Sequence, residues 1–133
     1  VQNTFGGVLL QKPLLSKHRG FANVAYETNG WKFDLTANVI GSKRVPTTNT
    51  NPPEHVQSTV STTFVMMNAQ VSTVLGKTNG IEIYLGGENL GNFLQQQSIV
   101  APNDPFGRYF DASLIWGPVQ GRMIYTGLRF KMK

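Results

Sequence analysis

Hydrophobic and polar residues alternate along much of this chain, most regularly at residues 31–39. The sequence there, "WKFDLTANV", has an apolar side chain at every odd position and a polar side chain at every even position. Nine residues of strict alternation predict an antiparallel strand with one apolar face and one polar face. Residues 20–28 alternate in a similar way, and Asn29-Gly30 lies between the two stretches. This dipeptide favours a type I′ turn, in which both central residues have positive φ, so we predict a β-hairpin.

Further strands are predicted downstream of this hairpin. Residues 58–75 are rich in Thr and Val and alternate over most of their length. The turn sequence "GKTNG" at residues 76–80 separates them from another alternating stretch at residues 81–90. A last alternating strand is expected at residues 121–133. Since no segment shows a clear helical period, we predict an all-β fold with antiparallel, long, up-and-down strands.

The connections between these strands alternate between short and long. Residues 46–57 contain three prolines and predict a loop, because proline cannot donate a hydrogen bond in a sheet. Residues 91–120 form a longer irregular connection that is rich in aromatic side chains, with a candidate short strand at Phe110–Trp116. Short turns at one rim and long loops at the other are typical of outer-membrane β-barrels.

Strand length points the same way. The alternating stretches run for about 9–15 residues, whereas strands in globular sheets most often have about 5–6. A tilted membrane-spanning strand needs about 9–11 residues. The polar faces carry charged residues in mid-strand, such as Lys32, Asp34 and Glu82, which a water-filled lumen tolerates. We therefore expect part of a transmembrane β-barrel. A soluble β-sandwich, which also has one dry and one wet face, is the alternative.

Composition removes several other classes of protein. The 133 residues are 40% hydrophobic and contain no apolar run of about 18 residues, which excludes a transmembrane helix. The sequence has no cysteine, so disulfides, thiolate catalysis and cysteine-based zinc sites are absent. The formal net charge is +5, but the basic residues are scattered along the sequence, so no nucleic-acid partner is expected.

No arrangement typical of an active site or a metal site is found in the sequence. His18 and His55 lie far apart in two different predicted loops. Met66 and Met67 are adjacent, so on a strand they point to opposite faces. Gly86-Gly87 is followed by no helix and is therefore not a dinucleotide-binding fingerprint. We expect no enzymatic activity, no metal and no cofactor.

Two segments in their order and spacing resemble the C-terminal end of TonB-dependent outer-membrane receptors. They are "YLGGENLGNF" at residues 84–93 and "GRMIYTGLRFKM" at residues 121–132. In that family the penultimate strand commonly closes with Asn-Leu, and the final strand commonly opens with Gly-Arg. Between them, "DPFGRYFDASLIWGPVQGR" at residues 104–122 is similar to the last extracellular loop of one branch of the family. Residues 17–46 fit the strand, turn and strand that precede a Pro-rich loop in that branch.

The resemblance implies that residues 1–133 are the last strands of a barrel, without a plug domain and without a TonB box. Barrels of this family usually have about 22 strands. The implied function is uptake of a scarce nutrient across the outer membrane of a Gram-negative bacterium. The nutrient classes of the family are siderophores, cobalamin, metal chelates and oligosaccharides. The implied partners are the rest of the barrel and plug, the TonB complex through the missing plug, membrane lipid, and an extracellular small-molecule or glycan ligand.

The two ends of the sequence add to this picture. The chain ends on Lys133, three residues after Phe130, whereas many outer-membrane proteins end on the aromatic residue. The opening "VQNTFGGVLL" has no signal peptide, which indicates a processed N-terminus or a piece of a longer protein. Two other interpretations stay open. One is a soluble β-sandwich module that binds a ligand or carbohydrate. The other is a truncated receptor fragment without transport activity.

The resemblance also implies an orientation, with the C-terminus in the periplasm and residues 46–57 and 91–120 outside the cell. In this arrangement Glu82 lies near the same rim as Arg129 or Lys131 of the adjacent strand. All three residues belong to the predicted polar, lumen-facing side. We therefore predict a cross-strand ion pair there.

The last long loop and its border supply the candidate ligand-binding residues, which are Tyr109, Phe110, Asp111, Trp116 and Arg122. Aromatic rings with a few charges suit the binding of a sugar or a chelate at a rim. The alternative is that these side chains pack the loop on itself or form an aromatic girdle at a membrane interface.

Overall fold

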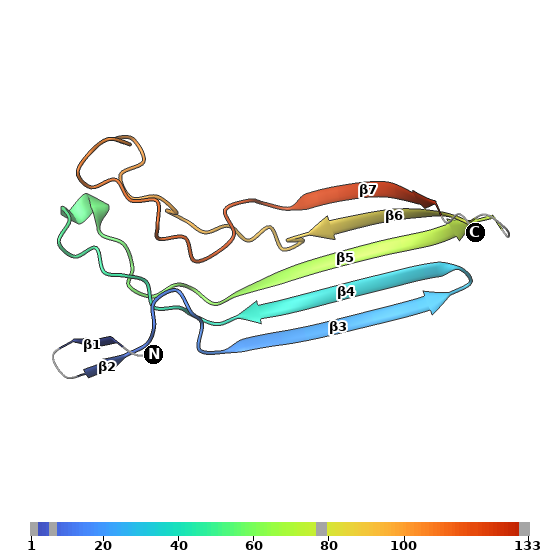
Figure 1. The fold of residues 1–133 in the computed structure, drawn as a ribbon, viewed down its shortest axis with the longest axis horizontal. Helices are drawn as coiled ribbons and strands as arrows, with labels where there is room; N and C mark the ends of the chain where they lie inside the picture. Colours follow the sequence, from blue (N-terminus) through green and yellow to red (C-terminus); the bar gives the residue numbers. More distant parts are fainter. Residues whose placement is uncertain (1–2, 6–7, 77–79, 131–133) are drawn as a thin grey trace. The chain divides into compact units, whose positions relative to one another are not determined.

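The computed structural model of the chain describes residues 3–5, 8–76 and 80–130. In this part of the chain, five long strands lie side by side in the order in which they follow one another in the sequence (Figure 1). They are β3 (Arg19–Thr28), β4 (Trp31–Ile40), β5 (Phe64–Leu75), β6 (Ile81–Glu88) and β7 (Met123–Phe130). The all-β prediction and the antiparallel up-and-down topology are thereby confirmed. The sheet is open, because β3 and β7 are not paired with each other.

Three short elements lie outside this sheet. β1 (Asn3–Phe5) and β2 (Val8–Leu10) form a separate two-stranded antiparallel ladder that was not predicted. η1 (Pro53–His55) is a single 3-10 turn in the Pro-rich connection. No helix in the described residues has the length and the apolar character that crossing a membrane requires.

The predicted type I′ turn is confirmed, since Asn29 has φ of 48° and Gly30 has φ of 80°. This turn joins β3 to β4 and determines which of their residues lie opposite each other. Tyr26 stacks on Phe33 with ring centroids 6.5 Å apart, as residues opposite each other on one face do. The other predicted turn, between β5 and β6, includes residues 77–79, which lie outside the described residues.

Several predicted strand boundaries were wrong. The strand predicted at 58–75 begins only at Phe64, and ahead of it Val60 forms an isolated bridge with Arg44 outside the sheet. Ser58 Oγ accepts a hydrogen bond from Val60 N at 3.3 Å, and Ser61 Oγ accepts one from Lys43 N at 2.8 Å. The strand predicted to reach residue 90 ends at Glu88, since Asn89 adopts the left-handed region with φ of 49°.

The short strand expected at Phe110–Trp116 does not form. Only an isolated bridge between Val100 and Asp111 is present in this region. The backbone N–H of Trp116 donates to the side chain of Gln95 instead of to a neighbouring strand. Residues 110–116 are therefore part of a packed loop and not of a sheet.

The described chain divides into two compact units. The sheet unit comprises residues 20–39, 65–93 and 121–133, and the loop unit comprises residues 1–19, 40–64 and 94–120. Residues 131–133 of the sheet unit lie outside the described residues. The units are described separately below.

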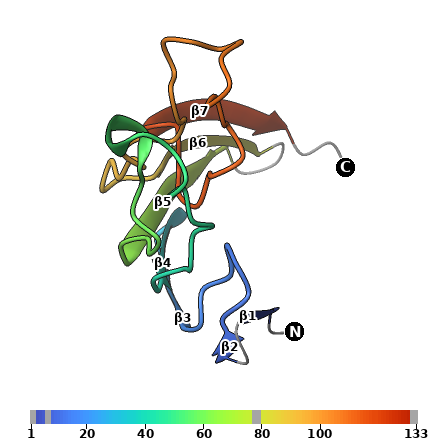
Figure 2. The same ribbon diagram turned by 90° about the vertical axis from the view of Figure 1, so that its left-hand side faces the viewer.

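The sheet unit has one apolar face and one polar face, as the alternation predicts. The sheet curves from β3 to β7, which is visible in Figure 2. Apolar side chains on one face are widely exposed, with Leu85 at 50% and Leu128 at 58% of their full exposure. On the other face the polar side chains of Ser72 and Glu82 are only 4% and 7% exposed. The apolar face is thus uncovered, and on the polar face burial is confined to the β5–β7 side, because Asn23 and Asp34 on β3 and β4 are exposed.

The loop unit has a small apolar core of its own. Val45, Val100 and Leu114 are each at most 3% exposed and form one cluster. Trp116 packs against this cluster and lies 6.1 Å from Phe64, measured between ring centroids. Three segments far apart in the sequence are therefore held together by apolar contacts, as in an ordinary folded domain.

Candidate functional site

The polar face of the sheet unit carries an ordered set of side chains on β5, β6 and β7. The register places Glu82 opposite Arg129, and Arg129 Nη1 lies 2.9 Å from Glu82 Oε2. The expected cross-strand ion pair is therefore present, whereas Lys131 lies outside the described residues. Ser72 Oγ donates a second hydrogen bond, at 3.0 Å, to Glu82 Oε1. Both oxygens of this buried carboxylate thus have partners, which its low exposure requires.

Two tyrosines on the same face each cover a glycine of the neighbouring strand. Tyr84 lies opposite Gly127, and Tyr125 lies opposite Gly86. A Cβ built on Gly127 would come within 2.3 Å of Tyr84 Oη, and one on Gly86 within 2.2 Å of Tyr125 Cζ. Only glycine leaves room for these rings, so the Gly-Tyr pairs fix how β6 and β7 fit together.

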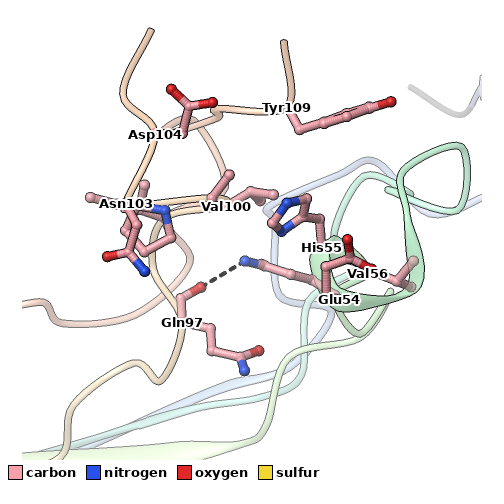
Figure 3. A pocket seen from close by; sticks show the side chains of 12 residues that line it. Glu54, His55, Val56, Gln97, Val100, Asn103, Asp104 and Tyr109 are labelled. Atoms are coloured by element: carbon pink, nitrogen blue, oxygen red, sulfur yellow. Dashed lines mark hydrogen bonds between the residues drawn. The ribbon is translucent and has the colours of Figure 1, made fainter. Parts of the chain in front are cut away.

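The loop unit holds a cavity of about 370 Å³, shown in Figure 3. Its wall comes from two segments, residues 54–57 at η1 and residues 97–109 of the long connection. Gln57 Nε2 donates a hydrogen bond of 3.0 Å to Gln97 O and links the two segments (Figure 3). The side chains of His55 and Tyr109 meet at the cavity, with ring centroids 5.8 Å apart. The cavity is thus built entirely within one unit.

The loop unit is held together by buried polar side chains that hydrogen-bond the backbone. Gln95 is 7% exposed, and its Oε1 accepts from Trp116 N at 2.8 Å and from Gly117 N at 2.9 Å. Its Nε2 donates to Leu114 O at 2.9 Å. Thr48, equally buried, accepts from Gln57 N at 2.7 Å through its hydroxyl. Irregular backbone is stable inside a protein only when its polar groups are paired in this way.

Lys43 is a further anchor of the loop unit. Its Nζ donates to the backbone oxygen of Trp116 and lies 5.8 Å from the centre of the Phe64 ring. Partial burial lowers the pKa of Lys43, and the nearby positive charge of Arg19 lowers it further. Both causes act by disfavouring the charged ammonium.

The predicted ligand-binding residues do not form one site in the structure. Tyr109 lines the cavity. Trp116 instead packs on the core of the loop unit, and Asp111 Oδ1 accepts a hydrogen bond of 2.7 Å from Ser113 N within a turn. Phe110 is 37% exposed, and Arg122 belongs to the sheet unit, where its N–H donates to Asn92 Oδ1 at 2.8 Å.

Sequence reasoning missed most of the side chains around the cavity. The polar ones are Glu54, His55, Gln57, Gln97, Asn103 and Asp104. They lie in two predicted loops, and no periodic pattern connects the loops, so the sequence carried no signal for their proximity. His55 was considered only as part of a metal pair with His18. Among the described residues, no group of three or more His, Asp or Glu side chains is arranged to hold a metal ion.

No family model, no curated protein and no solved structure matches this chain.

Proposed function

We propose that this chain is part of a TonB-dependent outer-membrane receptor that takes up a scarce nutrient. The observation that carries the proposal is the apolar face of the sheet unit, whose side chains are exposed while polar side chains on the opposite face are paired. An exposed apolar face of this extent suits contact with lipid acyl chains. The motifs at residues 84–93 and 121–132 favour this receptor family among outer-membrane proteins.

The lengths of β3 and β4 are consistent with strands that span a membrane. β3 and β4 have 10 residues each. At about 3.3 Å per residue and a tilt of about 45°, such a strand spans about 23 Å, close to the apolar band of outer-membrane barrels. The remaining strands of the barrel and the plug then belong to partner segments of the receptor.

Aromatic side chains gather at one end of the apolar face. Near the Asn29-Gly30 turn, Phe33 stacks with Tyr26 and with Trp31, at centroid distances of 6.5 and 6.3 Å. The same end of the sheet carries Phe130, since Ile81 at the start of β6 pairs with it. Rings at this level suit the lipid headgroup region, where outer-membrane barrels have aromatic girdles. In the proposed orientation this end is periplasmic.

One observation favours the soluble β-sandwich module as a second candidate. The apolar face has a hollow of about 500 Å³ next to the small residues Ala69 and Gly87. In a sandwich, a second layer of protein covers this face and its side chains fill the hollow. The third interpretation, a receptor fragment without transport activity, has the same sheet surface as the receptor and differs only in its partners.

The absence of cysteine makes a direct test of the apolar face simple. Single cysteines at Leu35, Val71 and Leu128 sample the apolar face, and matched cysteines at Asp34, Gln70 and Arg129 sample the polar face. Each variant is labelled with a polarity-sensitive dye, and the chain is folded in lipid vesicles. We expect lipid-borne quenchers to reach the first set and water-borne quenchers to reach the second. Quenching of the first set by neither agent, in a chain that is monomeric in plain buffer, contradicts the receptor proposal.

A further inference from the structure

Polar side chains at the cavity of the loop unit differ from those elsewhere in the unit in their hydrogen bonding. Elsewhere in the unit, Gln95, Thr48 and Ser61 are buried, and each hydrogen-bonds the backbone. Around it, the side chains of Glu54, Asn103 and Asp104 form no hydrogen bond or ion pair with any other described residue. The side chains of Glu54, Asn103 and Asp104 are exposed at the cavity and are therefore available to a ligand.

The charge of the cavity limits what it can hold. Two of the seven acidic residues in the chain, Glu54 and Asp104, line it. Among the described residues no lysine or arginine lines it, although the chain as a whole has a net charge of +5. Two carboxylates without a basic partner repel anions, so an anionic chelate is a poor fit.

The cavity also offers donors and not only acceptors. Asn103 and Gln97 contribute carboxamides, His55 an imidazole and Tyr109 a phenolic hydroxyl. A simple cation needs acceptors alone, whereas vicinal hydroxyl groups both donate and accept hydrogen bonds. The guanidinium of Arg108 lies 5.9 Å from the centre of the Tyr109 ring, where its positive charge offsets part of the negative charge of the two carboxylates.

The backbone of the wall is held in an unfavourable conformation. Gln97 and Ala101 line the cavity and have φ of 51° and 47°. The left-handed region costs a residue other than glycine or asparagine on the order of 1–2 kcal/mol. Such strain is concentrated at binding sites in many proteins, because it holds polar groups in position before the ligand arrives.

We propose that this cavity binds a neutral, polyhydroxylated ligand, that is, a carbohydrate unit. The volume of about 370 Å³ is in the range of ordinary ligand sites and suits one or two sugar rings. Carboxylates and carboxamides bind vicinal hydroxyls, and the apolar part of the wall, which includes Val56, Ile99 and Pro102, packs against the ring. The role of this cavity as the ligand site of a receptor rests on the proposed function. Binding of the sugar itself requires only that the loop unit is folded.

The test is isothermal titration of the purified 133-residue chain with neutral sugars at millimolar concentrations, after a neutral glycan array has selected them. Citrate serves as the anionic probe, and putrescine and Ca²⁺ serve as the cationic probes. We expect saturable binding of at least one neutral sugar and none of citrate. Asp104→Asn and Asn103→Ala each weaken the affinity for the sugar at least about tenfold, because each removes hydrogen bonds to the ligand.

Two loop variants outside the cavity wall serve as matched controls. Phe106→Ala changes a fully exposed ring on the same connection, and Asn49→Ala changes an exposed amide in the other loop. Both keep the wild-type affinity if the cavity is the site. Circular dichroism and elution volume confirm that the Asp104 and Asn103 variants are folded.

Three outcomes overturn the inference. They are no saturable sugar binding, binding of citrate or of the cationic probes in place of sugar, and equal loss of affinity in the control variants. These outcomes are separable from failure of the receptor proposal. The quenching experiment on the sheet unit does not depend on the cavity, and sugar binding by a chain that is soluble in plain buffer favours the sandwich module instead.

Discussion

The sheet unit and the loop unit place apolar side chains in opposite environments. In the loop unit Val45, Val100 and Leu114 are buried at the centre, and the polar side chains among them hydrogen-bond the backbone. In the sheet unit Leu85 and Leu128 are exposed, while Glu82 is buried and paired. The loop unit therefore has the organisation of a protein in water. The sheet unit requires something apolar over one face, and we interpret this as lipid.

The difference also concerns how each unit is stabilised. Hydrophobic burial stabilises the loop unit from within, and its backbone is irregular. Ladder hydrogen bonds and cross-strand pairs stabilise the sheet unit, and its apolar face adds to stability only when it is covered. The two tryptophans allow the units to be followed separately, since Trp31 lies in the sheet unit and Trp116 in the loop unit.

The largest effect is expected from Leu114→Ala in the loop unit. Leu114 is 3% exposed, and emptying such a site costs about 2–5 kcal/mol. Its neighbour Ile115 is 47% exposed, so Ile115→Ala serves as the matched control with a cost below about 1 kcal/mol. Denaturant unfolding followed by Trp116 fluorescence measures both. Equal costs for the two variants would show that the buried cluster does not stabilise the loops.

The second prediction compares adjacent residues on β3. Val24 is 66% exposed on the apolar face, and Ala25 is exposed on the polar face. In lipid vesicles we expect Val24→Arg to cost about 2–4 kcal/mol, because it places a charge in the hydrocarbon. Ala25→Arg is expected to change the free energy of unfolding by less than about 0.5 kcal/mol. If both variants unfold like the wild type in lipid, the apolar face does not meet the membrane.

The third prediction concerns the Gly-Tyr pairs of the sheet unit. Gly127→Ala displaces the Tyr84 ring and is expected to cost about 1–3 kcal/mol. Combining it with Tyr84→Ala removes the clash, so the two changes are not additive in a double-mutant cycle. Gly20→Ala on β3 is the control, since its new Cβ would meet Val39 at an ordinary 3.5 Å. Strict additivity at Gly127 and Tyr84 contradicts the role assigned to this pair.

A smaller effect is expected from the Glu82–Arg129 ion pair. Arg129→Met leaves the buried carboxylate of Glu82 with its hydrogen bond from Ser72. The Arg129 side chain is 60% exposed and therefore partly screened by solvent, so we expect a cost of about 1 kcal/mol. The change in the free energy of unfolding is measured by Trp31 fluorescence. Lys32→Met is the control, because Lys32 Nζ lies 3.9 Å from Glu27 Oε1 and both side chains are exposed. The control is expected to have almost no effect.

The smallest effect is a pH dependence of the loop unit. The pKa of Lys43 is lowered in the folded protein by partial burial and by Arg19, so the unfolded chain binds more protons between the folded pKa and about 10.4. The stability of the loop unit should therefore rise slightly as the pH increases through this range. Lys43→Met is expected to lack this contribution, which Trp116 fluorescence unfolding at several pH values detects. A variant with the same pH profile as the wild type contradicts the assignment.

Much of the sheet unit was determined by the sequence itself. Alternation of apolar and polar residues is a local property of a strand, and Asn29-Gly30 has the positive φ values that its turn requires. The Asn29-Gly30 turn sets the register of β3 on β4 locally, whereas β6 and β7 are joined by a long connection, so the position of Glu82 opposite Arg129 joins residues 47 apart in the sequence. The alternation of apolar and polar residues does not specify which molecule covers the apolar face.

The loop unit was decided by tertiary structure. Val45, Val100 and Leu114 are separated by many residues, and nothing periodic marks them as one cluster. Gln95 has no distinctive sequence context, yet its side chain replaces the strand hydrogen bonds that were expected near Trp116. Likewise, the proximity of His55 to Tyr109 depends on two loops closing over a shared core. Sequence patterns report local periodicity, whereas loop packing is set by contacts between residues far apart in the chain, and only the folded chain reveals which of them meet.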